Sequence, residues 1–171
     1  MKRVVIVVWA LLLVIVVCVY IFPRTILKSK AVHVHAGFQV YTNNKIVDFS
    51  DFKYMHEAPC TVNGKPVEGY KDEQMEKAHL HDQTGDVVHV HRDNAIWGDL
   101  FQNIKYPLSP ENINVYINGV KTENFLEQKI EPYHSVVIFV GEQENVQVRL
   151  KNAVKKDRIL QVEKKSETCS G

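Results

Sequence analysis

The chain opens with a strongly apolar segment. Residues 4–22 carry no charged side chain, and as a helix they would span roughly 28 Å, close to the hydrocarbon thickness of a bilayer. The run is longer than the apolar core of a cleaved signal peptide, and no small-residue cleavage site follows it. The pattern therefore predicts a transmembrane signal anchor over residues 1–22, followed by a juxtamembrane linker over residues 23–30.

Basic residues flank both ends of this segment. Lys2 and Arg3 precede it, and three more basic residues follow within residues 23–30, so charge alone does not decide the orientation. The very short leading tail is typical of a signal anchor that leaves the following domain outside. We expect a single-pass protein of the cell membrane, held there by residues 4–22, with an extracytoplasmic domain.

An alternating strand pattern follows the linker. In residues 33–42 (HVHAGFQVYT), every second side chain is apolar, whereas His33 and His35 fall on the opposite face. Asn43-Asn44 is a turn signal, and the following KIVDF returns as the second arm of a hairpin. The apolar face consists of Val34, Ala36, Phe38 and Val40.

A similar pattern recurs in the second half of the chain, where residues 114–119 (NVYING) align with residues 39–44 (QVYTNN). Asn118-Gly119 predicts a second hairpin, because both residues tolerate a positive φ. A last strand over residues 135–141 is continuously apolar, which indicates a central position in the sheet.

Between the two hairpins the period becomes helical, with Asp93 or Asn94 as the expected N-cap. This order of elements predicts an α+β fold, namely a β-grasp-like (ubiquitin-like) domain over residues 31–141 with an insertion at residues 50–92. A charged C-terminal helix or tail follows over residues 142–171. The apolar stripe of the expected helix consists of Ile96, Trp97, Leu100, Phe101 and Ile104.

The charge distribution argues against a nucleic-acid partner. The net charge of +1 gives no long-range field that would attract a polyanion. In the C-terminal segment, acidic residues are interspersed among the lysines, which indicates a solvated helix that frays at its end. No nucleic acid is therefore expected to bind.

Histidine is the anomaly of the composition. The chain contains eight histidines, and most of them form His-x-His pairs. Residues i and i+2 of a strand point to the same face about 6.5–7 Å apart, so two such imidazoles can converge on one ion. Repeated pairs in one domain are more than packing requires. They are His33 with His35, His79 with His81, and His89 with His91.

The second and third pairs are expected to meet. Thr84-Gly85-Asp86 is a turn signal between them, so the two pairs form the arms of one tight loop and four imidazoles lie close together. His56 and His134 stand alone in the sequence, and we interpret both as ordinary polar residues.

Cys60 lies in the same insertion and has two competing interpretations. A thiolate with imidazoles is a ligand set suited to zinc or copper. In an oxidising compartment Cys60 could instead form a disulfide with Cys169 and pin the tail to the insertion. The two roles exclude each other, because a disulfide sulfur is a poor metal ligand.

No motif of a known enzyme class is present. The HLHD sequence departs from the H-x-H-x-D-H motif of metallo-β-lactamases, because Asp82 directly follows the second histidine. Zincin, nucleophile-elbow and P-loop motifs are also missing. A zinc site with three protein ligands would still leave a position for water, and Asp82, Asp86 or Glu57 would then act as general base or would orient the ligand histidines.

The sequence supports three functions in descending order. The first is an extracytoplasmic zinc- or copper-binding domain that is structural or handles metal. The second is a protein-interaction module without metal that binds a partner at a sheet edge. The third is a small metallohydrolase.

Three segments carry a resemblance to a known group: HVHAGFQVY, HLHDQTGDVVHVHR and AIWGDLFQNI. With them the chain resembles a group of uncharacterised membrane-anchored, His-x-His-rich proteins of bacteria and archaea, over about residues 31–141. The resemblance implies a common β-grasp-like fold. It implies no activity, because none is established for the group, so the metal prediction depends on the residues themselves.

Overall fold

Strand β1 (Ala31–Thr42) organises the domain by pairing with three other strands. The computed structural model describes residues 31–56, 61–62, 65–66 and 72–166. Within them β1 lies parallel to β8 (Ser135–Val140) and antiparallel to β2 (Lys45–Ile46) and β5 (Val87–Arg92). Strand β5 pairs with the first half of β1, so the predicted insertion contributes a strand to the sheet.

The sheet has six strands in an α+β arrangement. Five of them follow the order β2-β1-β8-β6-β7, with β5 beside β1. Strand β8 lies between β1 and β6, which confirms the central position predicted for the last apolar run. The remaining elements are β3 (Thr61–Val62), β4 (Lys65–Pro66), α2 (Trp97–Asn103), β6 (Ile113–Ile117), β7 (Val120–Thr122), α3 (Val146–Lys151), α4 (Lys156–Ser166) and short 3-10 turns at Phe52–Tyr54, Pro110–Asn112 and Phe125–Glu127.

Both predicted hairpin turns are present. Asn43 and Asn44 have φ values of 45° and 68° between β1 and β2, and Asn118 and Gly119 have 52° and 81° between β6 and β7. A two-residue hairpin turn of this kind requires positive φ at both positions, which asparagine and glycine adopt most easily.

The main core lies between the sheet and α2. Ala36, Phe38 and Val40 of β1 are at most 1 % exposed, as their alternation predicts, and the apolar stripe of α2 packs onto them. The start of α2 differs from the prediction. The helix begins at Trp97, and the Asp99 carboxylate accepts from the Ile96 backbone N–H at 3.0 Å, so the N-cap predicted at residue 93 or 94 was wrong.

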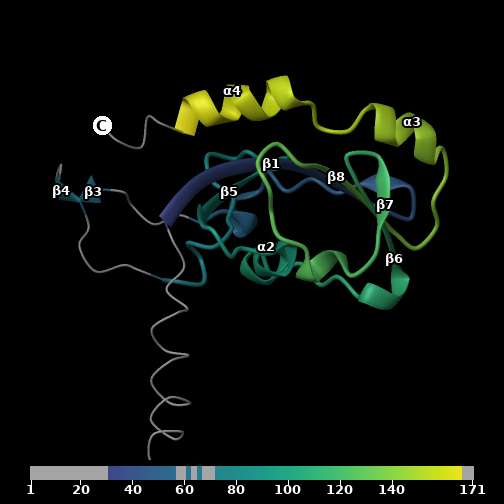
Figure 1. Cartoon of the computed structure of the whole chain (residues 1–171), viewed down its shortest axis with the longest axis horizontal. Coiled ribbons are helices and arrows are strands. Elements are labelled where there is room, and N and C mark those ends of the chain that lie inside the picture. Colours follow the sequence, from purple (N-terminus) through teal and green to yellow (C-terminus); the bar gives the residue numbers. More distant parts are fainter. Residues whose placement is uncertain (1–30, 57–60, 63–64, 67–71, 167–171) are drawn as a thin grey trace, which may run out of the picture. The chain divides into compact units, whose positions relative to one another are not determined.

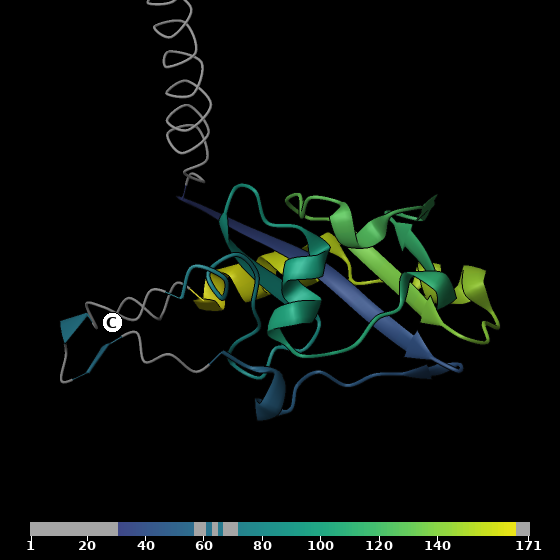
Figure 2. The same cartoon turned by 90° about the horizontal axis from the view of Figure 1, so that it is seen from below.

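Helix α4 covers the opposite face of the sheet, over β1 and β5 (Figures 1 and 2). Its Ile159 and Val162 are buried with Val87 of β5 in a second, smaller core. The close approach depends on Gly37 of β1, where a Cβ atom would come within 2.5 Å of the Val154 side chain. The prediction of a solvated C-terminal helix was therefore wrong for the inner face of α4.

Some predictions fall outside the described residues. These are the signal anchor at 1–22, the linker at 23–30, and Glu57, Cys60 and Cys169. In the part of the chain that the structure describes, no helix is long and apolar enough to cross a membrane.

Candidate metal centre

The backbone register places three histidines in a row across neighbouring segments. His35 of β1 lies directly opposite His89 of β5. On the other side of His89, the segment at His79 forms an isolated antiparallel bridge, with N–H···O distances of 3.0 and 2.9 Å between the two residues. Directly opposed residues of antiparallel strands point to the same face, so the three imidazoles lie side by side.

The remaining member of each pair, namely His33, His81 and His91, falls on the same face. A β-bulge in β1 between Ala31 and Val34 lies next to His33, whose ring centroid is 5.2 Å from that of His91. The His81 ring is 3.6 Å from that of His89, as the loop predicted at Thr84-Gly85-Asp86 requires. The structure thus brings together all six histidines of the three pairs, on the face that α4 covers.

His33, His35 and His89 are the tightest group. Their ligand nitrogens all lie within 4.8 Å of one another, and Nε2 of His35 is 2.9 Å from Nδ1 and 3.1 Å from Nε2 of His89. His35 and His89 are 2 % and 1 % exposed, whereas His33 is exposed. The group is therefore positioned to bind a metal ion, with one ligand at the surface and two below it.

Burial lowers the pKa of four rings of the cluster. Burial, reinforced by the neighbouring histidines, lowers the pKa of His35 to about 4, and burial lowers the pKa of His79 to about 3. Burial also lowers the pKa of His89 and His91. Metal ligation needs neutral imidazole, so the lowered pKa of these four rings favours the form that binds a metal.

Two of the rings have their Nδ1 atom engaged on the outside of the cluster. Nδ1 of His79 lies 2.9 Å from the Met75 carbonyl oxygen, and Nδ1 of His81 lies 2.7 Å from the Asp82 carboxylate. Both partners accept, so Nδ1 is the donor in each contact, and Nε2 is the nitrogen that faces the other way. Asp82 thus has the orienting position that the sequence offered as one alternative.

His56 joins the cluster, contrary to its interpretation as an isolated polar residue. Its ring centroid is 5.3 Å from that of His79. The position follows from a parallel bridge between Met55 and Leu80 and from the His56 N–H, which donates to the Leu80 carbonyl at 2.8 Å. No periodic pattern surrounds His56, so nothing in the sequence indicates its contact with His79.

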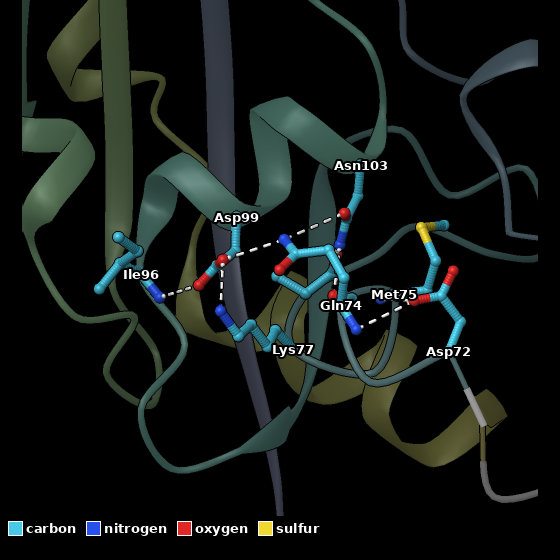
Figure 3. A network of polar contacts seen from close by, with 8 residues as sticks. Asp72, Gln74, Met75, Lys77, Ile96, Asp99 and Asn103 are labelled. Atoms are coloured by element: carbon cyan, nitrogen blue, oxygen red, sulfur yellow. Dashed lines mark hydrogen bonds and ion pairs between the residues drawn. The ribbon is translucent and has the colours of Figure 1, made fainter. Parts of the chain in front are cut away.

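A polar network fixes the segment that leads into His79 (Figure 3). The buried carboxylate of Asp99 accepts from Lys77 Nζ and from Gln74 Nε2, each at 3.0 Å. Asn103 donates to the carbonyl of Ala78 at 2.7 Å. Helix α2 therefore positions His79 through the chain immediately before it.

One of the acidic residues that the sequence offered as a general base is engaged in an ion pair. Asp86, one of the candidate general bases, forms a bidentate ion pair with Arg158 at 2.9 Å for both contacts. One surface pocket lies beside α2 and another at β6 and β7, and neither has a histidine in its lining.

No protein-family model, no curated protein and no solved structure matches this chain.

Proposed function

We propose that this chain is a metal-binding protein whose histidine cluster holds a zinc or copper ion. The observation that carries the proposal is the convergence of ligand nitrogens from His33, His35 and His89 within 4.8 Å. In this proposal the role is structural or one of metal handling, and His79, His81 and His91 supply further ligands or take part in exchange of the ion.

The spacing of the nitrogens fits such an ion. Zinc–nitrogen bonds of 2.0–2.1 Å in a tetrahedral site place two ligand nitrogens about 3.3 Å apart. The shortest nitrogen–nitrogen distances between His35 and His89 are 2.9 and 3.1 Å. An opening of a few tenths of an ångström, within the range of a side-chain rotation, would therefore admit the ion.

The chemistry of the ligands favours a transition metal such as zinc or copper over magnesium or calcium. Imidazole suits zinc, copper, iron and nickel, whereas magnesium and calcium select carboxylate and carbonyl oxygens. The grouped residues are all histidines. A role for Cys60 as an additional ligand would strengthen the preference for zinc or copper, and its alternative is the disulfide with Cys169.

An ion also accounts for the burial of so many imidazoles. Removing a polar ring from water costs roughly 2–7 kcal/mol unless a partner in the protein replaces the water. His35 and His89 are almost fully buried, and their nitrogens face each other at 2.9 and 3.1 Å. A bound ion would satisfy their inward-facing lone pairs together.

The placement of the site in the cell is part of the same proposal. We infer a signal anchor at residues 4–22 from their uncharged apolar run, and with it an extracytoplasmic domain. The strand order β2-β1-β8-β6-β7 with a parallel β1–β8 pair supports a β-grasp-like classification of the domain, and thereby the proposed kinship with the His-x-His-rich membrane-anchored group.

A protein-interaction module without metal is the second candidate. Strand β7 ends the sheet order, and its Val120 is 69 % exposed. A free sheet edge accepts a strand from a partner. In that case the histidines would serve only as packed polar side chains. A metallohydrolase ranks third, because Asp86, one of its candidate general bases, is held in an ion pair with Arg158.

Elemental analysis of the purified full-length chain, combined with thermal unfolding, tests the proposal. We expect about one equivalent of zinc or copper and a higher unfolding temperature when either ion is added. Less than about a tenth of an equivalent, with no thermal shift, would contradict it. The variant His134→Ala serves as the control, because His134 has no ring contact with the cluster among the described residues.

A further inference from the structure

His35 faces two different partners with its two nitrogens. Its Nε2 atom turns toward His89 at 2.9 Å, whereas its Nδ1 atom lies 3.9 Å from a carboxylate oxygen of Glu163. The His35 side chain is fully buried and that of Glu163 is 30 % exposed. The carboxylate therefore lies behind the ring, on the side away from His89.

Glu163 is held at this place by its own helix. On α4 the neighbouring Ile159 and Val162 are buried against the second core, and Arg158 forms the bidentate pair with Asp86 immediately before β5. These contacts fix the helix to the strand that carries His89, so they keep the backbone of Glu163 beside His35.

Tyr133 connects the same two residues. Its backbone N–H donates to the His35 carbonyl at 2.8 Å, and its hydroxyl donates to Glu163 Oε2 at 3.2 Å. Tyr133 has a φ of 60°, a left-handed conformation that is unfavourable for a bulky side chain. The surrounding contacts thus hold Tyr133 in a strained backbone that aims its hydroxyl at Glu163.

We propose that Glu163 is the positioning residue for the metal ligand His35: it accepts the Nδ1–H of the ring, so that Nε2 presents its lone pair to the ion. This inference rests on the proposed metal function. In many metal sites a carboxylate behind a ligand histidine fixes the tautomer and orientation of the ring. The 3.9 Å separation is longer than a hydrogen bond, and in this proposal a small rotation of the Glu163 side chain closes it in the metal-free chain as well as with the ion bound.

Metal affinity of the full-length chain tests this role in three variants. Glu163→Leu keeps the apolar volume but removes the acceptor, and we expect it to weaken zinc binding by roughly 10–100-fold. Glu163→Gln retains an oxygen that accepts the Nδ1–H, so we expect it to recover most of that loss. Asp157→Leu removes the same charge from an exposed position of the same helix and should bind zinc as the unaltered chain does.

Tyr133→Phe tests a smaller contribution to the same contact, namely the hydroxyl that holds Glu163. It removes the hydroxyl that donates to Glu163 but keeps the ring, and we expect zinc affinity to fall by roughly 2–10-fold, as for the loss of one hydrogen bond. In a chain that already carries Glu163→Leu, the Tyr133 hydroxyl has lost its partner. Adding Tyr133→Phe to that chain should therefore not change zinc affinity further. Additive losses in the double variant would contradict a shared role.

A spectroscopic measurement separates positioning from a general loss of structure. Nitrogen-15 NMR of the metal-free full-length chain reports which nitrogen of His35 carries the proton. We expect the Nδ1–H form in the unaltered chain and in Glu163→Gln, and a mixture of both forms in Glu163→Leu. An Nε2–H ring in the unaltered chain would overturn the role of Glu163.

The two proposals fail in different ways. A chain that binds neither zinc nor copper refutes the metal function, and the role of Glu163 in ligation with it. If the unaltered chain binds zinc and Glu163→Leu binds it within about twofold of Asp157→Leu, the metal function stands and only the positioning role is refuted.

Discussion

Nε2 of His35 lies 2.9 Å from Nδ1 of His89, between side chains that oppose each other across β1 and β5. Both rings are buried and their pKa values are lowered by that burial. Two neutral imidazoles at this distance share one proton, and a metal ion in place of that proton would be bound by both. The contact is therefore the centre of the proposed site.

Removal of either ring should abolish tight metal binding. We expect His35→Phe and His89→Phe each to weaken zinc binding by more than about 100-fold, because even loss of a residue that only orients a ligand costs up to that much. Isothermal titration calorimetry gives the affinities. His134→Ala should bind as the unaltered chain does, and an equal loss in that variant would point to a nonspecific effect.

The metal-free protein should lose stability in mild acid. The pKa is lowered from 6.5 to about 4 for His35 and to about 3 for His79, so between pH 6.5 and pH 4 the unfolded chain takes up protons that the folded chain does not. The free energy of unfolding is then constant above pH 6.5 and falls as the pH drops below it.

Each such group contributes about 1.4 kcal/mol per pH unit, so the two together lower stability by roughly 2–4 kcal/mol between pH 6.5 and pH 5. Urea unfolding in the presence of a chelator measures this change. His35→Phe should show a shallower slope. Equal stability of the unaltered chain at pH 7.5 and pH 5 would exclude buried neutral histidines.

Gly37 should be required for the docking of α4. A Cβ atom at this position would lie 2.5 Å from the Val154 side chain, so Gly37→Ala should destabilise the protein by roughly 1–3 kcal/mol through overpacking. In the double variant with Val154→Gly, the alanine gains space and the two effects should not add. Additivity of the two free energies of unfolding would show that these residues do not touch.

The Asp99 network should stabilise the segment before His79. Lys77→Met leaves the Asp99 carboxylate buried without its 3.0 Å ion pair, and we expect a loss of roughly 1–3 kcal/mol in urea unfolding. Lys129→Met is the matched control. Its pair with Glu131 is about half exposed on both sides, so its loss should change stability by less than about 1 kcal/mol.

Much of the cluster follows from local sequence. The alternation around His33 and His35 gives a strand with both rings on one face, and the turn at Gly85 brings His79 opposite His89. Period-2 patterns and turn residues act over a few positions, so one sequence is enough to identify them. The three pairs were therefore predictable as a group.

The burial of the cluster was not predictable in the same way. It depends on α4 fitting against Gly37, and nothing in the charged C-terminal segment indicates which strand its few apolar side chains will meet. The position of Glu163 depends on the same long-range packing, and that of His56 on the bridge between Met55 and Leu80. The start of α2 was misplaced because Asp99, inside the helix, takes over the capping that a preceding side chain usually supplies.

X-ray absorption spectroscopy of the zinc-loaded full-length chain is the sharpest test of whether the histidine cluster binds the ion. It measures the ligand atoms and their distances around the ion. We predict a shell of imidazole nitrogens at about 2.0–2.1 Å from zinc. Fewer imidazoles should bind zinc in His35→Phe, and the same number should bind it in His134→Ala. A zinc ion bound without imidazole scattering, or a spectrum unchanged by His35→Phe, would contradict it.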